Sequence, residues 1–217
     1  MFDARLRRLI DPPMNRLGQT MVSIGISANQ VTSVGLVLGV IAGLLITQQF
    51  YLWGLVVLLL SRVMDGLDGA VARASCKTDL GGYLDIVFDF IFYGLIPLGF
   101  ALADPDKNAV AACVLLMAFY ANGASFLAYA IMAEKREIST ESHGSKSLYF
   151  TGGLAEAGET FAVFAAFCLF PTAFAWIAYG FALITAITTI SRIILATQVF
   201  RDLPEEVAEE IFEQENS

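Results

Sequence analysis

The sequence predicts an all-α integral membrane protein: a bundle of six transmembrane helices with an N-terminal interfacial amphipathic helix. Hydrophobic residues make up 57% of the 217 residues and charged residues only 16%, whereas soluble domains are nearer half apolar and a quarter charged. The mean hydropathy is +0.66. Several apolar segments approach or exceed the roughly 20 residues that a helix needs to cross a bilayer. Basic residues gather in alternate connections, as in polytopic membrane proteins.

The first segment, residues 3–24, mixes basic and apolar side chains. Four arginines stand among leucine, isoleucine, methionine and valine: Arg5, Arg7, Arg8 and Arg16. This pattern is typical of a helix that lies in the headgroup region, with its arginines reaching lipid phosphates. A plain connector beside the membrane is the alternative interpretation.

Six apolar segments follow and are interpreted as spans. They cover about 31–48, 51–72, 80–102, 109–134, 154–170 and 173–200. No internal repeat divides them, so residues 1–203 are expected to form one membrane domain. The last segment, 204–217, holds six glutamates and no basic residue. It is expected to be a solvated acidic tail on the cytoplasmic side.

The distribution of charge predicts the orientation. An even number of spans places both termini on one side, together with the connections after the second and fourth spans. That side holds nearly all the basic residues outside the spans: Arg5, Arg7, Arg8, Arg16, Arg73, Lys77, Lys135, Arg136, Lys146 and Arg201. By the positive-inside rule this side is cytoplasmic. The chain has no basic stripe of the kind that binds nucleic acid.

Four aspartates lie at the cytoplasmic ends of the second and third predicted spans. Asp65 and Asp68 are three residues apart and Asp85 and Asp89 four apart, so each pair lies on one helix face. The short connection makes the two helices antiparallel neighbours, which brings the carboxylates together. A charged aspartate in a bilayer costs about 2.5–3.5 kcal/mol, and four would repel one another without cations. Carboxylates in this number suit Mg²⁺ or Mn²⁺.

Small residues and an arginine accompany the aspartates. Gly66 and Gly69 leave one helix face open to a bulky ligand, and Arg73 is placed to bind a phosphate. The structural alternative is that the aspartates cap helix ends or pair with Arg62 and Arg73. Capping explains one or two of them, but not four at spacings of three and four residues.

The pattern has a family resemblance. It resembles the motif of the CDP-alcohol phosphotransferases, and reads Asp65-x2-Asp68-Gly69-x2-Ala72-Arg73-x7-Gly81-x3-Asp85-x3-Asp89. The resemblance implies a phospholipid-synthesising enzyme that transfers a phosphatidyl or phosphoalcohol group from a CDP-linked donor to an acceptor hydroxyl and releases CMP. It also implies a multi-pass protein of the bacterial inner (plasma) membrane with a cytoplasmic active site, and a homodimer. CDP-diacylglycerol is the expected donor.

The resemblance also implies roles for individual residues. Two divalent ions, Mg²⁺ or Mn²⁺, would be held on the donor diphosphate by all four aspartates, and Asp89 would also be the base that deprotonates the acceptor. The expected contacts to the cytidine diphosphate are Gly69, Arg73 and Thr78. The family's short motif before the first span has Ala28 here in place of proline. Its remaining polar residues, Asn29 and Thr32, are further expected donor contacts.

The acceptor site is less defined by sequence. Family members with phosphorylated acceptors carry basic residues near the end of the fourth span, and 126–134 has none. The candidates are Lys135, Arg136, Lys146, Arg192, Glu156 and Glu159. Arg192 either binds the acceptor or pairs with another side chain. Glu156 and Glu159 either cap the fifth span, pair with a basic residue or recognise the acceptor.

Three other functions are compatible with part of the pattern. A family member with a CDP-linked small alcohol as donor and diacylglycerol as acceptor would share the motif. A divalent-cation transporter would also place carboxylates in the membrane, but along a path through the bilayer rather than at one rim beside an arginine. An inactive scaffold would not need the intact motif.

Overall fold

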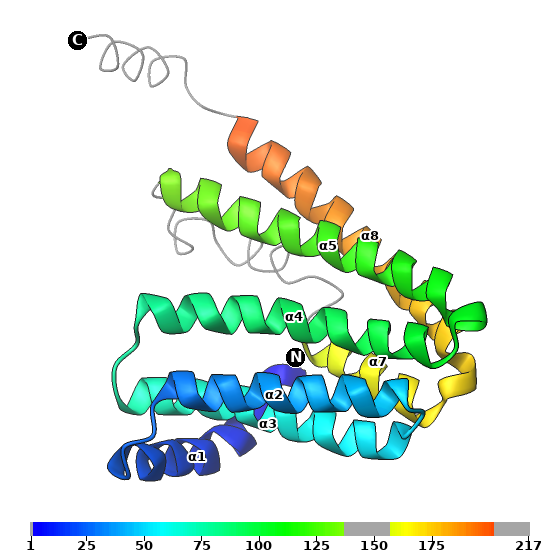
Figure 1. Ribbon diagram of the computed structural model, residues 1–217. Helices are drawn as coiled ribbons and strands as arrows, with labels where there is room; N and C mark the ends of the chain where they lie inside the picture. Colours follow the sequence, from blue (N-terminus) through cyan, green and yellow to red (C-terminus); the bar gives the residue numbers. More distant parts are fainter. Residues whose placement is uncertain (1, 137–156, 202–217) are drawn as a thin grey trace. The chain divides into compact units, whose positions relative to one another are not determined.

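Every regular element in the described part of the chain is helical. The computed structural model describes residues 2–136 and 157–201 (Figure 1). Their α-helices are α1 (Phe2–Ser23), α2 (Ala28–Thr47), α3 (Tyr51–Ala74), α4 (Asp79–Ala103), α5 (Pro105–Lys135), α7 (Ala157–Leu169) and α8 (Phe174–Arg201), with a short 3-10 helix, η1 (Pro171–Ala173), before α8. The all-α prediction is confirmed, and the predicted segments match these helices to within about one turn.

Four described stretches are long and apolar enough to cross a membrane. They are Ala28–Thr47, Asp79–Ala103, Pro105–Lys135 and Pro171–Arg201. Helix α3 is 24 residues long, but its residues 62–73 include two arginines and two aspartates. Helix α7 has 13 described residues. The membrane character of the chain is therefore supported by four helices, and the count of six spans remains a prediction.

The described residues divide into two compact units, 2–116 with 157–180, and 117–136 with 181–201. In the first unit α2 packs against both α3 and α4, while α1 and α7 each pack against α3 (Figure 1). The core of this unit is rich in phenylalanine, with fully buried side chains at Phe92, Phe100, Phe164, Phe167 and Phe174.

Glycines allow α2 and α4 to approach closely. A Cβ on Gly99 would lie 2.9 Å from the backbone oxygen of Gly43, and one on Gly39 would lie 2.8 Å from Cδ2 of Phe92. Contacts this short exclude a larger side chain unless the helices separate. The small residues of α2 therefore set the position of α4, which carries two of the aspartates.

Helix α1 is held against α3 by a similar contact. A Cβ on Gly18 would lie 2.8 Å from the backbone carbon of Ala70. Met14, Met21 and Val22 pack against a buried cluster formed by Val31, Leu67, Ala70 and Val71. The predicted N-terminal helix is thus present, and part of its apolar face packs on protein. Leu17, 52% exposed, is among the apolar side chains left outside that contact.

Candidate functional site: a carboxylate cluster beside a cationic pocket

Three of the four aspartates form a close group in the first unit. One carboxylate oxygen from each of Asp65, Asp68 and Asp85 lies within 4.8 Å of the other two. Asp65 and Asp68 share one face of α3, and Asp85 lies in the second turn of α4. The short connection 75–78 makes the two helix segments neighbours. The convergence predicted from the spacing is present for these three residues.

The group fits a divalent cation. Asp68 is only 6% exposed, and its Oδ2 is buried without a hydrogen-bond partner among the described residues. A buried carboxylate oxygen needs a donor or a cation, because leaving it unpaired is costly. The three carboxylates each offer an oxygen to the same small volume, and carboxylate oxygens are the ligands that Mg²⁺ and Mn²⁺ prefer.

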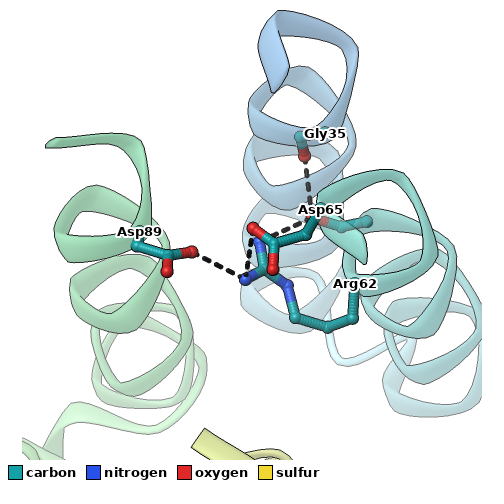
Figure 2. Close-up of polar contacts among 5 residues, drawn as sticks. Gly35, Arg62, Asp65 and Asp89 are labelled. Carbon is teal, nitrogen blue, oxygen red and sulfur yellow. Dashed lines mark hydrogen bonds and ion pairs between the residues drawn. The ribbon is translucent and has the colours of Figure 1, made fainter. Parts of the chain in front are cut away.

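Asp89 has a different partner. Its Oδ1 accepts a hydrogen bond from Nη1 of Arg62 at 2.9 Å, and the same nitrogen lies 3.3 Å from Oδ1 of Asp65 (Figure 2). Nη2 of Arg62 donates to Oγ of Ser61 at 3.2 Å, whose hydroxyl donates to the backbone oxygen of Gly35 at 2.7 Å. Asp89 is thus oriented by an arginine from the neighbouring helix.

A pocket of about 450 Å³ opens beside the cluster. Its lining comes from the start of α2, the end of α3, the connection to α4 and the first two turns of α4. The lining residues are Ser27, Ala28, Asn29, Thr32, Asp68, Gly69, Ala72, Arg73, Ser75, Cys76, Lys77, Thr78, Gly81, Gly82 and Asp85. All five residues that the sequence predicts as donor contacts lie in this lining, next to two of the aspartates.

Two helices begin at the pocket wall. Ser27 caps α2 in a capping box with Gln30, and Oγ1 of Thr78 caps α4 by accepting a hydrogen bond from the Gly81 amide at 3.1 Å. The N-terminus of a helix carries partial positive charge and favours anions. Lys77 adds a cation that the sequence analysis did not assign to the site. The pocket thus combines anion-attracting helix ends and cationic side chains with carboxylates at one edge.

Arg73 is held from outside the motif. Its Nη2 donates to Oδ1 of Asn15 in α1 at 3.1 Å. Sequence reasoning did not single out Asn15, because nothing in the local pattern shows that α1 folds back on the end of α3. The close contact at Gly18 makes this possible.

The predicted acceptor residues fall in several places. Lys146 and Glu156 lie outside the described residues, as does the acidic segment 204–217. Lys135 is exposed in the last turn of α5, and Glu159 is exposed in the first turn of α7.

In the second unit Arg192 and Arg136 both tie α5 to α8. Arg192 is 7% exposed, and its Nη1 donates to the backbone oxygen of Asn122 at 3.1 Å, to Oδ1 of Asn122 at 2.9 Å and to Oγ of Ser125 at 3.2 Å. Nη2 of Arg136 donates to the backbone oxygen of Phe200 at 2.9 Å. Arg192 was expected either to bind the acceptor or to pair with another side chain. These contacts favour the pairing, and the partners, Asn122 and Ser125, are neutral.

Comparisons with known proteins agree on one family. The profile of the CDP-alcohol phosphatidyltransferases matches residues 25–200. The chain is 44% identical over 193 residues to the inner membrane protein YnjF of Escherichia coli (strain K12), covering 89% of this chain and 94% of that one. It is 33% identical over 100 residues to the archaetidylinositol phosphate synthase of Pyrococcus horikoshii, covering 46% of this chain and 53% of that one.

The fold is also similar to a solved structure. The crystal structure of Mycobacterium tuberculosis phosphatidylinositol phosphate synthase with CDP-DAG bound gives a TM-score of 0.69 at 20% identity, covering 85% of this chain and 93% of that one. At this identity the likeness concerns the fold, while the profile match extends over most of the sequence and includes every aspartate of the cluster. The chain therefore belongs to the CDP-alcohol phosphatidyltransferase family.

Proposed function

We propose that this protein is a membrane transferase that moves the phosphatidyl group of CDP-diacylglycerol to an acceptor hydroxyl and releases CMP. The observation that carries the proposal is the pocket in which Asp68 and Asp85 adjoin Arg73 and Lys77. Carboxylates there suit a divalent cation, and cationic groups suit a diphosphate. The diphosphate of a CDP-linked donor can bind both the divalent cation and the cationic side chains.

Individual residues take distinct roles in this proposal. Asp65, Asp68 and Asp85 would hold Mg²⁺ or Mn²⁺, and the ion would supply neutralisation of the negative charge on the leaving phosphate. Arg73, braced by Asn15, binds a diphosphate oxygen. The remaining predicted donor contacts surround the nucleotide: Gly69, Thr78, Asn29 and Thr32.

The proposed reaction is a displacement at phosphorus. The acceptor oxygen forms a bond to the phosphorus that carries the diacylglycerol, and the bond from this phosphorus to the bridging oxygen breaks. The electron pair leaves with CMP. The proton of the acceptor hydroxyl passes to Asp89, which acts as the general base.

The donor and the membrane topology are part of the proposal. A relative of the same fold is described with CDP-DAG bound, and a relative at 44% identity is described as an inner membrane protein. We place six spans in the bacterial inner membrane, with both termini and the pocket on the cytoplasmic side. A lipid donor then keeps its acyl chains in the bilayer while its nucleotide reaches the pocket. The active unit in this proposal is a homodimer, as the family resemblance implies.

The proposal is tested by CMP release. Purified protein is incubated with Mg²⁺ or Mn²⁺, CDP-diacylglycerol and a panel of acceptors that includes matched phosphorylated and unphosphorylated alcohols. We expect CMP and a new phospholipid with at least one acceptor. Asp68→Asn should abolish both products, and Lys107→Met, on an exposed side chain paired with Asp104, should retain them. Absence of CMP with every acceptor from folded protein would contradict the proposal.

The same assay distinguishes the donors. A CDP-linked small alcohol with diacylglycerol replaces CDP-diacylglycerol in a parallel series. Faster CMP release in that series would overturn the assignment of CDP-diacylglycerol while leaving the transferase reaction in place. The acceptor panel reports whether a phosphorylated acceptor is used. The candidate residues for binding the acceptor are Lys135, Arg136, Lys146, Arg192, Glu156 and Glu159.

A further inference from the structure

The guanidinium of Arg62 is enclosed between the aspartate helices. Its side chain is 10% exposed, and Nη1 lies 3.3 Å from Asp65 and 2.9 Å from Asp89. Its Cζ lies 3.6 Å from the ring centroid of Phe92 and 5.3 Å from that of Phe161. Figure 2 shows Arg62 reaching across from α3 between the two carboxylates.

This position depends on residues from three helices. Phe92 packs against α2 at Gly39, where a Cβ would lie 2.8 Å from the phenylalanine ring. Oγ of Ser61 accepts a hydrogen bond from Nη2 of Arg62, and its hydroxyl donates to the backbone oxygen of Gly35 in α2. Nε of Arg62 is buried with no partner among the described residues. A buried arginine that forgoes one hydrogen bond is stabilised chiefly by the carboxylates and ring it contacts.

The aspartates are therefore divided into two groups that share Asp65. One group contains the unpartnered Oδ2 of Asp68 and suits a divalent ion. In the other group a fixed positive charge already lies between Asp65 and Asp89. A second divalent ion between those carboxylates would compete with the guanidinium for the same oxygens and be repelled by its charge.

We propose that Arg62 takes the place of a second metal ion: the chain binds one divalent cation at Asp65, Asp68 and Asp85, and the guanidinium neutralises and orients Asp89. This inference rests on the proposed function in that the cation is the one used by the transferase. It differs from the two-ion site that the family resemblance implies. Arg62 is a positioning residue, because it acts on the reaction through Asp89.

The experiment counts bound ions directly. Mn²⁺ is titrated into purified full-length protein without donor or acceptor, and the free-ion signal in electron paramagnetic resonance gives the number bound per chain. We expect one Mn²⁺ for the wild type and for Arg62→Lys, which keeps the charge. Arg62→Met should bind two, because Asp89 then lacks a counter-ion and can share a second ion with Asp65. Lys107→Met, which removes a positive charge away from the cluster, should bind one.

A second variant keeps the test decisive if Arg62→Met fails to fold. Asp89→Asn removes the partner of Arg62 and leaves the three proposed ligands, so it should still bind one Mn²⁺ with an affinity within about threefold of the wild type. Two ions in the wild type, one ion in folded Arg62→Met, or loss of Mn²⁺ binding in Asp89→Asn would each overturn the proposal.

The count is independent of catalysis. If one ion binds as expected but no CMP is released, the transferase proposal fails and the role of Arg62 stands. If CMP is released by a wild-type chain that binds two ions, the role of Arg62 fails and the transferase proposal stands.

Discussion

Asp68 and Asp89 are the same residue type in the same motif, yet their surroundings differ. Asp68 is buried beside the pocket with one oxygen unpartnered, which suits a metal ligand. Asp89 is 31% exposed at its side chain and already paired with an arginine. The pairing orients its carboxylate while leaving part of it accessible, as the proposed role of general base requires. The chemistry of each aspartate is thus set by its neighbours.

Asp89→Asn tests this division of roles. We expect CMP release to fall by about 10²–10⁴-fold or more, because loss of a general base typically costs this much. Equilibrium binding of CDP-diacylglycerol in the presence of Mn²⁺ should stay within about threefold of the wild type. Asp68→Asn is the comparison, since it should weaken both donor and metal binding. Normal turnover by Asp89→Asn would show that another group accepts the proton.

At the scale of elements, α1 braces the wall of the pocket. It packs on α3 through the Gly18–Ala70 contact and positions Arg73 through Asn15. The contacting residues, from Met14 to Val22, follow Pro12 and Pro13 within one continuous helix. The segment that the sequence predicts to be an interfacial helix or a connector therefore braces a residue of the proposed donor site.

Gly18→Ala tests the coupling between α1 and the pocket. The added Cβ would lie 2.8 Å from the Ala70 backbone carbon, so α1 must shift, at an overpacking cost of about 1–3 kcal/mol. We expect a lower melting temperature and a raised KM for the CDP-linked donor, with a smaller change in kcat. Gly180→Ala is the matched control, because a Cβ there meets nothing within 4 Å. Equal behaviour of the two variants would refute the coupling.

At the scale of the whole molecule, the charge distribution defines the proposed orientation. Nearly all basic residues outside the spans belong to the side of the termini, and Arg73 and Lys77 line the pocket on that side. In the proposed orientation the positive-inside rule puts the pocket on the cytoplasmic side, where CMP would be released.

Reporter fusions test the orientation. Green fluorescent protein fused after Ser217 should fluoresce and alkaline phosphatase at the same point should be inactive, because both termini are cytoplasmic in the proposal. Alkaline phosphatase fused after Asp106, in the connection between the third and fourth predicted spans, should be active. Fluorescence together with an inactive phosphatase at Asp106 would contradict the six-span arrangement.

The local sequence pattern was sufficient to predict the helices and the grouping of Asp65, Asp68 and Asp85. Helix positions follow from apolar length and from breaks at residues such as Ser27 and Thr78, which cap the next helix. The spacing of Asp65, Asp68 and Asp85 requires a common location once two short-looped helices are antiparallel. These properties depend on residues near in sequence, where helix geometry leaves few alternatives.

Only the tertiary structure decided how distant side chains pair. Arg62 was recognised in the sequence solely as an alternative partner for the aspartates, and its contact with Asp89, 27 residues away, depends on glycine-mediated packing of α2 against α4. The contact of Asn15 with Arg73 spans 58 residues and that of Arg192 with Asn122 spans 70. The sequence by itself determined which helices form and where the carboxylates lie along them. The tertiary structure decided the partner of each charge, because that choice depends on how helices cross, and crossing is set by contacts between residues far apart in the chain.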